Sequence, residues 1–413
     1  MKRALASVAA LLISVSILLT GQGLQGTLLP VRASLENFST LSVGAFGAAY
    51  FLGFTLGCLK GAELVGRVGH VRVFLAMTAI ASAVPLVHGL VIQPWVWSLL
   101  RLTTGFCLAI LYVVIESWLN ERSTNETRGV IFSTYAMITL TVLAVGQMMM
   151  VLYDPSGLQL FAIASVLVSI AAVPVGLSTS PSPEPPEAMS VNVPRLFRIS
   201  PAGTLGCLAT GLANGSFWSL APIFVVGLTK NVSLAALFMT SVVIGGALAQ
   251  WPLGVLSDHV DRRAIMGVMT VVAAALGALM VMFAGQLSHT QLNLLGACWG
   301  AAALPMYAIS VAHANDHADP TEYVTVSSGL LLAYGIGAIV GPFTASLLMT
   351  ARGPTGLYLF TAVIHLLLAA VIVVRSVRSR APAEEQRITF SDALATAQTA
   401  SQVYEEEIQQ HQE

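Results

Sequence analysis

The sequence predicts an all-α membrane protein with twelve transmembrane helices, arranged as two pseudo-symmetric six-helix bundles. Three observations support this prediction. Only 9% of the 413 residues are charged, against about 25% in soluble domains, so the chain lacks the charges to cover a surface exposed to water. Twelve apolar runs are each long enough to cross a bilayer, which takes about 20 residues. One long polar break divides these runs six and six.

The twelve runs follow one another through short connections. They cover residues 5–30, 41–60, 72–92, 96–119, 129–151, 159–178, 203–228, 233–256, 264–286, 291–312, 324–350 and 356–376. Lys2 and Arg3 precede the first run, as they would in a secretory signal. The run reaches Pro30, however, and is longer than a signal core of about 7–15 residues. We therefore interpret it as the first membrane helix, in contact with the lipid bilayer like the others.

The connections define four segments. Residues 1–178 are predicted to form the N-terminal bundle and residues 202–376 the C-terminal bundle. Residues 179–201 between them are rich in proline and serine, which is typical of a flexible linker. Residues 377–413 are a polar tail that ends in EEEIQQHQE.

Lysine and arginine are unevenly distributed between alternate connections. With the N-terminus in the cytoplasm, fifteen of the nineteen basic residues lie in cytoplasmic segments, whereas Arg32, Lys230 and Arg352 lie outside and Arg101 lies within the membrane. Basic residues favour the cytoplasmic side of a membrane protein. We therefore predict a multi-pass protein of the cell inner membrane with both termini, the linker and the tail in the cytoplasm.

Composition and motifs also exclude several functions. The net charge of −1 argues against nucleic acid as a partner, which requires a concentrated basic surface. We find no nucleophile–base pair, metal quartet or phosphate loop, so we expect no enzymatic activity, no metal and no cofactor. The cluster of His313, Asp316, His317 and Asp319 is interpreted as solvated, helix-capping residues rather than as a metal site.

The connection after the eighth run carries a glycine, an aspartate and a basic pair. It reads Gly254-Val-Leu-Ser-Asp258-His-Val-Asp-Arg262-Arg263. This resembles the signature of the major facilitator superfamily between the second and third helices of each half. The resemblance implies that the carboxylate and the arginines bridge the cytoplasmic helix ends when the inner gate is shut.

The same signature is degraded in the first half. Gly66 stands where the aspartate belongs, while Arg67 remains. The inner salt bridge of this half should therefore be weak or use another acid, such as Glu63 or Glu116. Glu116 lies at the predicted cytoplasmic end of helix 4, where we expect it to form a gate ion pair with Arg67 or Arg128.

Two further stretches extend the resemblance. Arg101-Leu-Thr-Thr-Gly105 is similar to the arginine–glycine motif that the superfamily carries in helix 4, and residues 327–342 are rich in glycine. Together these stretches resemble the YcaD-like branch of the superfamily over residues 5–376. The resemblance implies the major facilitator fold, with helices 1, 4, 7 and 10 lining a path between the halves near the membrane midplane.

The first half supplies three candidate residues for substrate binding. Arg101 lies about five residues into helix 4, and a charge inside a membrane is costly enough to suggest function. It would hold an anionic or carbonyl group of the substrate or gate proton movement; the alternative is a structural arginine. Gln22 and Gln25 are three residues apart and so share one face of helix 1, where they would bind solute groups or link helices.

The second half supplies four candidates. Asn214 and Trp218 are four residues apart on helix 7, and an amide beside an aromatic ring suits a flat polar solute. Trp299 and Tyr334 are weaker candidates of the same kind, and packing is the alternative role for these aromatic residues.

These features predict a secondary active or facilitative transporter that moves a small organic solute, such as a metabolite or a vitamin-like molecule, by alternating access. Uptake is preferred to export because helix 5 lacks the glycine–proline motif of the drug–proton antiporters of the superfamily. The alternatives are a drug or metabolite exporter and a transporter-derived sensor that signals through the tail. No acidic residue falls mid-span, which leaves uniport, or proton coupling through Arg101, His88 or water, open. We expect a functional monomer.

Overall fold

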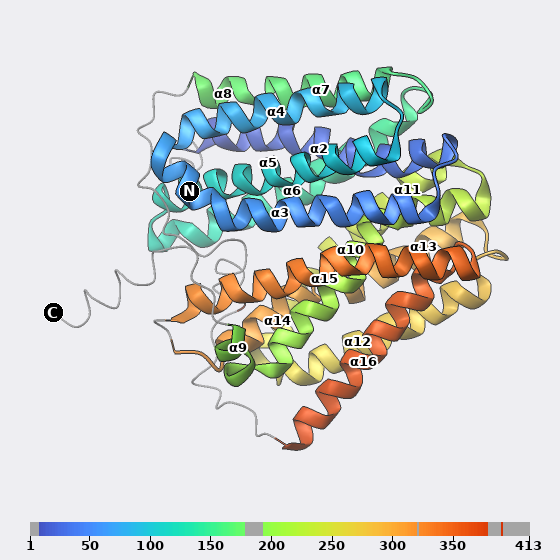
Figure 1. Cartoon of the computed structure of the whole chain (residues 1–413). Coiled ribbons are helices and arrows are strands. Elements are labelled where there is room, and N and C mark those ends of the chain that lie inside the picture. The colour runs from blue at the N-terminus through green and yellow to red at the C-terminus, as the bar shows by residue number, and fades with distance from the viewer. Residues whose placement is uncertain (1–7, 178–192, 320–321, 379–389, 391–413) are drawn as a thin grey trace.

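The computed structural model describes residues 8–177, 193–319, 322–378 and 390. Within these residues the chain is helical and contains no strand, and twelve segments are long and apolar enough to cross a membrane. The predicted all-α class with twelve membrane helices is therefore confirmed. In Figure 1 most helices of the first half lie above those of the second half, and α11 of the second half reaches the level of α3 and α6.

The first half consists of α2 (Ala9–Leu35), α3 (Thr40–Val68), α4 (His70–Leu90), α5 (Pro94–Glu121), α6 (Asn125–Met148) with the 3-10 turn η1 (Met149–Val151), and α7 (Gln159–Ile170) continued by α8 (Ala172–Gly176). The second half consists of α10 (Pro201–Thr229), α11 (Val232–His259), α12 (Arg262–Phe283), α13 (His289–Ala303) continued by α14 (Met306–Asn315), α15 (Tyr323–Arg352) and α16 (Gly356–Arg378).

Several helix boundaries differ from those expected, and three of the differences affect the packing. α3 continues to Val68, eight residues beyond the predicted end at residue 60. α2 continues to Leu35, so Arg32 lies in the last helical turn rather than in a loop, and it donates to the Pro155 carbonyl at 2.9 Å. The tenth run is divided into α13 and α14 around Pro305, because proline lacks the N–H that a continuous helix requires.

The predicted linker is described only in part. Residues 178–192 lie outside the described residues, whereas Val193–Ile199 form a short helix, α9, where a flexible segment was expected. Arg195 of α9 forms an ion pair with Glu322, which precedes α15. α9 is thereby attached to the second half, and the boundaries predicted for the four segments stay predictions.

Side-chain caps determine where several helices begin. The side chains of Ser39, Ser200, Asn231 and Ser288 each accept a hydrogen bond from a backbone N–H in the first turn of the helix that follows. Such caps satisfy donors that a helix start leaves without a partner. Because these polar residues sit between apolar runs, the predicted and observed helix starts agree to within a few residues.

Glycine allows the helices of the first half to pack backbone against backbone. A methyl group added at Gly53 of α3 would overlap the Leu102 carbonyl of α5, and one added at Gly105 of α5 would overlap the Tyr50 carbonyl of α3. A methyl group added at Gly23 of α2 would likewise overlap the Leu143 carbonyl of α6. Small residues at such crossings are typical of membrane helix pairs.

The second half repeats this arrangement with its own helices. Gly245 of α11 contacts the Ala297 carbonyl of α13, as Gly53 contacts the fourth helix of the first half. Gly211 of α10 contacts the Tyr334 carbonyl of α15, which corresponds to the contact of the first and fifth helices. Equivalent helix pairs in both halves thus use close glycine contacts, as a parallel repeat of six helices predicts.

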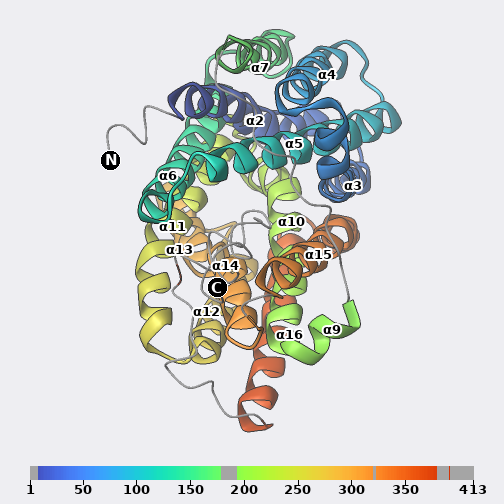
Figure 2. The same ribbon diagram turned by 90° about the vertical axis from the view of Figure 1, so that its left-hand side faces the viewer.

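The two ends of the molecule can be named by their turns. We call the end with the turns at residues 69, 122–124, 260–261 and 316–322 the linker end, and the end with residues 36–39, 91–93, 152–158, 230–231, 284–288 and 353–355 the far end. Figure 2 views the molecule from the linker end and shows α6 beside α11 and α3 beside α15. These helix pairs join the two halves.

Candidate functional site

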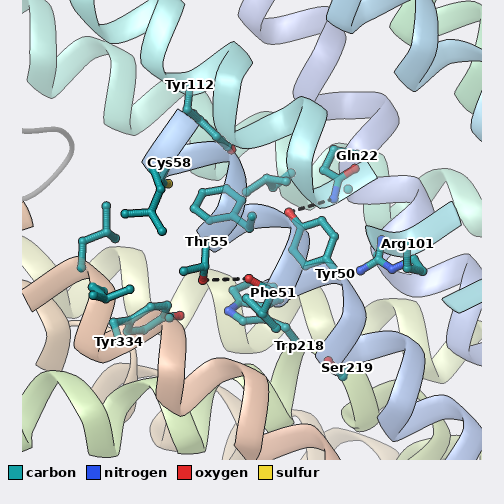
Figure 3. A pocket seen from close by; sticks show the side chains of 18 of the residues that line it. Gln22, Tyr50, Phe51, Thr55, Cys58, Arg101, Tyr112, Trp218, Ser219 and Tyr334 are labelled. Atoms are coloured by element: carbon teal, nitrogen blue, oxygen red, sulfur yellow. Dashed lines mark hydrogen bonds between the residues drawn. The ribbon is translucent and has the colours of Figure 1, made fainter. Parts of the chain in front are cut away.

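A cavity of about 340 Å³ lies between the two halves. Residues of α2, α3, α5 and α6 line it from the first half, and residues of α10, α11 and α15 from the second. In Figure 3 the helices of the two halves enclose it from opposite sides. A cavity with contributions from both halves of a repeat is where transporters of this architecture bind their solutes.

Arg101 is the charged residue of the cavity wall. Its side chain is only 9% exposed, and its guanidinium carbon lies 4.1 Å from the centroid of the Tyr50 ring. The Gln22 amide donates to the Tyr50 hydroxyl at 3.5 Å, so α2, α3 and α5 together hold this group. Figure 3 shows Tyr50 between Gln22 and Arg101. The face of an aromatic ring attracts a cation but does not neutralise its charge.

Four residues predicted from the sequence border the cavity: Gln22, Arg101, Trp218 and Tyr334. They come from four different helices, α2, α5, α10 and α15. Their predicted role in binding stays a prediction, but the fold brings them to one enclosed space.

Three other predicted residues lie outside the cavity lining. Gln25 and Asn214 are both buried, and an amide oxygen of each has no hydrogen-bond partner among the described residues. The shared helix face expected for Gln22 and Gln25 therefore does not bring both to the cavity. Trp299 is fully buried beside Phe217 and Tyr358, so it packs inside the second half instead of facing the space between the halves.

Most of the aromatic wall of the cavity was not predicted from the sequence. α3 contributes the largest share, through Tyr50, Phe51, Phe54, Thr55 and Cys58. Spacings of four residues place Tyr50, Phe54 and Cys58 on one helix face, a pattern that was visible in the sequence but not used.

The expectation that helices 1, 4, 7 and 10 line the path is correct only in part. The first, fourth and seventh helices do border the cavity, whereas no residue of α13 or α14 is among its lining residues within the described chain. The second, fifth, eighth and eleventh helices contribute instead. The reason is that α10 separates Trp299 from the space between the halves, where α3 and α15 lie side by side.

The halves pack tightly toward the far end. A methyl group at Gly44 of α3 would lie 2.6 Å from the Pro342 carbonyl of α15 and would also overlap the Ser346 side chain. On the opposite side of the interface, Thr240 of α11 donates to Gln147 of α6 at 3.3 Å. These contacts join the two halves near the far end, since each lies within about three helical turns of that end.

At the linker end of the second half, the signature residues form a buried ion network. Arg262 is 1% exposed and contacts Asp258 at 2.9 Å and Asp316 at 2.6 Å. It also donates to the Ala312 carbonyl. Asp316 was expected to be solvated; it is buried instead because α14 carries it against α12. It is thus a network member that the sequence analysis missed.

Arg263 belongs to a separate pair. It contacts Asp261 at 3.1 Å, and Asp261 also accepts from the Arg263 backbone N–H at 2.9 Å. Burial alone would raise the pKa of Asp261, but these hydrogen bonds outweigh burial and hold the pKa below its ordinary value. The carboxylate is therefore ionised at neutral pH, and its stabilising contribution is lost as the pH falls through the lowered pKa.

At the corresponding position of the first half, the signature carries an exposed ion pair. Arg67 pairs with Glu63 at 2.6 Å on the exposed helix surface, rather than with Glu116. Glu116 is buried and accepts from the Tyr135 hydroxyl at 3.3 Å. The side chain of Arg128 lies outside the described residues, so its predicted pairing stays a prediction. The degraded signature therefore corresponds to an ion pair that is exposed and weak.

We expect Asp316→Asn to destabilise the second half. The substitution leaves the buried Arg262 charge with one carboxylate fewer, which should cost about 1.5–3 kcal/mol. The measurement is the melting temperature of the purified protein in detergent. Glu121→Gln removes an exposed carboxylate at the same end of the molecule and serves as the control. Equal melting temperatures for the two variants would show that the network does not stabilise the fold.

Phe390 attaches the tail to the end of α11 that carries the signature residues Gly254 and Asp258. Its side chain is 7% exposed and packs in an apolar cluster with residues of α12, α14 and α16. It contacts Gly254, and its backbone N–H donates to Asp258 at 2.8 Å. The glycine and the aspartate of the signature are therefore both in contact with the tail.

Comparisons with known proteins agree with this geometry. A family model described as Major Facilitator Superfamily matches residues 203–403. The uncharacterized MFS-type transporter YcaD of Escherichia fergusonii is 26% identical over 355 residues, covering 85% of this chain and 91% of the relative. YcaD of an Escherichia coli strain is 27% identical over 344 residues, covering 82% and 88%.

Solved structures show the same fold. The nucleoside transporter NupG superposes with a TM-score of 0.76 at 14% identity, covering 89% of this chain and 98% of that chain. A bacterial homologue of the human lysosomal transporter Spinster, in an inward-facing and occupied conformation, superposes with a TM-score of 0.74 at 16% identity, covering 93% and 98%. The chain is therefore similar to membrane transport proteins of the major facilitator superfamily rather than to enzymes, and the relatives that it matches over most of its length are YcaD-type transporters.

Proposed function

We propose that this protein moves a small organic solute across the cytoplasmic membrane by alternating access, with its linker end in the cytoplasm. The supporting observation is the cavity between the halves, whose lining includes a buried arginine and near whose far end Gly44 and Thr240 join the halves. Contact between the halves on one side of a cavity is what one state of an alternating-access cycle requires. The basic residues concentrated at the linker end support the cytoplasmic assignment.

Uptake is the proposed direction, and a single chain is the proposed functional unit. In this arrangement the far end would open to the outside to admit the solute, and the linker end would open to release it. Both halves of the cavity wall come from one chain, so a monomer contains the whole site. Protons are the candidate coupling ion; flux measured with and without an imposed pH gradient separates coupled transport from facilitated diffusion.

A thermal-shift screen of the purified protein against metabolites, vitamins and drugs tests this proposal first. A solute that binds the folded state raises its apparent stability by mass action. We expect a hit whose shift is lost in Trp218→Ala, since Trp218 borders the cavity, and whose flux follows in proteoliposomes. Hits confined to lipophilic cations would instead favour the alternative of a drug exporter. A folded protein with no hit and no flux would contradict the proposal.

A transporter-derived sensor is the second candidate function, and the Phe390 contact favours it. Because the tail contacts Gly254 and Asp258, a movement of this end of α11 would also move the tail, which is proposed to lie in the cytoplasm.

Deletion of residues 379–413 separates the two candidate functions. For a transporter we expect flux to be retained and the melting temperature to fall, because the Phe390 ring leaves an apolar cluster and exposes the surface that it covered. The single substitution Phe390→Ala is the matched variant and should produce most of the same fall. Intact flux with an unchanged cellular response in both variants supports transport, whereas loss of a cellular response with no change in flux would support the sensor.

A further inference from the structure

We propose that the solute is an organic monoanion with a flat aromatic body, and that Arg101 and Tyr50, oriented by Gln22, bind its anionic group. This inference rests on the proposed function, because it names the class of solute that the cavity between the halves carries. Three features of the cavity support it: a buried cation with no counter-charge, a hydroxyl held in a donating role, and walls that are otherwise neutral and aromatic.

The first feature is the charge of Arg101. Its Nε and Nη1 atoms are buried and have no hydrogen-bond partner among the described residues, and no described carboxylate pairs with it. Stacking on Tyr50 is worth about 0.5–2 kcal/mol, whereas a buried charge without a partner costs several kcal/mol. An anionic solute in the cavity supplies the missing counter-charge, and hydrogen bonds between a guanidinium and an anion are among the strong ones.

The second feature is the hydroxyl of Tyr50. Gln22 donates to its oxygen at 3.5 Å, so this oxygen accepts, and the hydroxyl proton points to another acceptor. No described residue provides that acceptor. A phenol donates one hydrogen bond as well as accepting. The Tyr50 proton and the Arg101 guanidinium, which lies over the same ring, are therefore both donors to one anionic group.

The third feature is the remaining wall of the cavity. Apart from Arg101, its described lining residues include no aspartate, glutamate, lysine or histidine. A cationic solute would be repelled by Arg101, and a dianion would leave one of its charges unpaired in a low-dielectric space. The wall instead offers the rings of Phe51, Phe54, Trp218 and Tyr334 from both halves. A single negative charge on an aromatic body matches this surface.

The position of Arg101 orients the solute. Tyr112 also lines the cavity and lies eleven residues after Arg101 on α5, or about 16 Å further toward the linker end. The anionic group therefore binds nearer the far end, and the aromatic body extends toward the linker end. The volume of about 340 Å³ is near the lower limit of pockets that hold drug-sized ligands, about 300 Å³, and suits a body of one or two rings.

The test uses aromatic probes that differ in charge. The purified full-length protein is titrated with 2-naphthoate, its neutral amide 2-naphthamide, 2-naphthylmethylammonium and the dianion 2,6-naphthalenedicarboxylate, and binding is followed by calorimetry and thermal shift. Benzoate and indole-3-acetate extend the series of monoanions, and cyclohexanecarboxylate removes aromaticity. We expect the aromatic monoanions to bind at least about tenfold more tightly than the other classes.

Substitutions of single residues show which side chains contribute to the binding of the anionic group. Arg101→Gln should weaken the binding of 2-naphthoate at least about tenfold. It should also reduce the ratio between the affinities for 2-naphthoate and 2-naphthamide. Arg352→Gln removes an exposed arginine far from the cavity and should leave both values unchanged. Tyr50→Phe keeps the stacked ring but removes the hydroxyl. It should weaken the binding of 2-naphthoate more than the binding of 2-naphthamide.

The probes of different charge are measured on the unmodified protein. They therefore test the inference even if the Arg101→Gln variant does not fold. Preference for the neutral amide, the cation or the dianion would overturn the inference. If neutral or cationic solutes bind and are transported, the proposed transport function stands while the anion assignment fails. If no probe and no screened solute binds or moves, both fail together.

Discussion

Gly44→Trp is expected to abolish transport while leaving solute binding intact. Gly44 lies where α3 and α15 meet near the far end, and even a methyl group there would lie 2.6 Å from the Pro342 carbonyl and overlap Ser346. An indole cannot fit between these helices, because packed helix interiors leave no room for added atoms. The variant should therefore hold the halves apart at the far end and stop the cycle, which requires that end to close.

Cysteine labelling can detect this change of state. Cys58 borders the cavity on the part of α3 nearer the linker end, so a membrane-impermeant maleimide should reach it from that side. In Gly44→Trp we expect slower labelling from the linker end, with the other cysteines replaced. Gly285→Trp is the control, because nothing lies within 4 Å of a methyl group at that position. Normal flux in Gly44→Trp would show that the far end does not close in this way.

Gly105→Val is expected to unfold the first half or prevent its assembly. A methyl group at Gly105 would overlap the Tyr50 carbonyl and lie 2.9 Å from the Phe54 backbone nitrogen. Both obstacles are backbone atoms, so no side-chain rotation can relieve them, and overpacking of this kind costs about 1–3 kcal/mol or more. Separation of α3 from α5 would also remove Tyr50 from Arg101, so any protein that folds should have lost the binding site.

The yield of monodisperse protein and its melting temperature measure this effect. Gly267→Val makes the same substitution on α12, where an added methyl group meets the Ile372 side chain at an ordinary 3.5 Å, and should be tolerated. A Gly105→Val protein with the yield and melting temperature of Gly267→Val would show that the contact between α3 and α5 is looser than described.

Much of the fold could be predicted because the bilayer imposes its rules on short stretches of sequence. A membrane helix satisfies its own backbone hydrogen bonds and needs about 20 apolar residues, so the twelve helices could be recognised without knowledge of their partners. Arg101 could be singled out on the same ground, since a charge within an apolar run is costly wherever the helix packs.

The composition of the site was harder to predict because it depends on which face of each helix turns toward the other half. All-round apolar helices carry little of the periodicity that would reveal a face. Gln22 and Gln25 share a helix, yet only Gln22 borders the cavity. Trp218 borders it, whereas Trp299, the weaker candidate of the two in the sequence, is buried behind α10.

The sequence by itself determined the helical class, the number of membrane helices, the signature loop with Asp258 and Arg262, and the presence of a costly charge at Arg101. The tertiary structure alone decided that Tyr50 stacks on Arg101, that Asp316 joins Arg262, that Phe390 contacts the signature residues of α11, and that the halves are in contact near the far end. The physical reason is the range of the interactions. Transfer of a helix to lipid depends on residues next to one another in the chain, whereas these contacts join residues that are distant in the sequence and depend on how the packed helices are rotated and spaced.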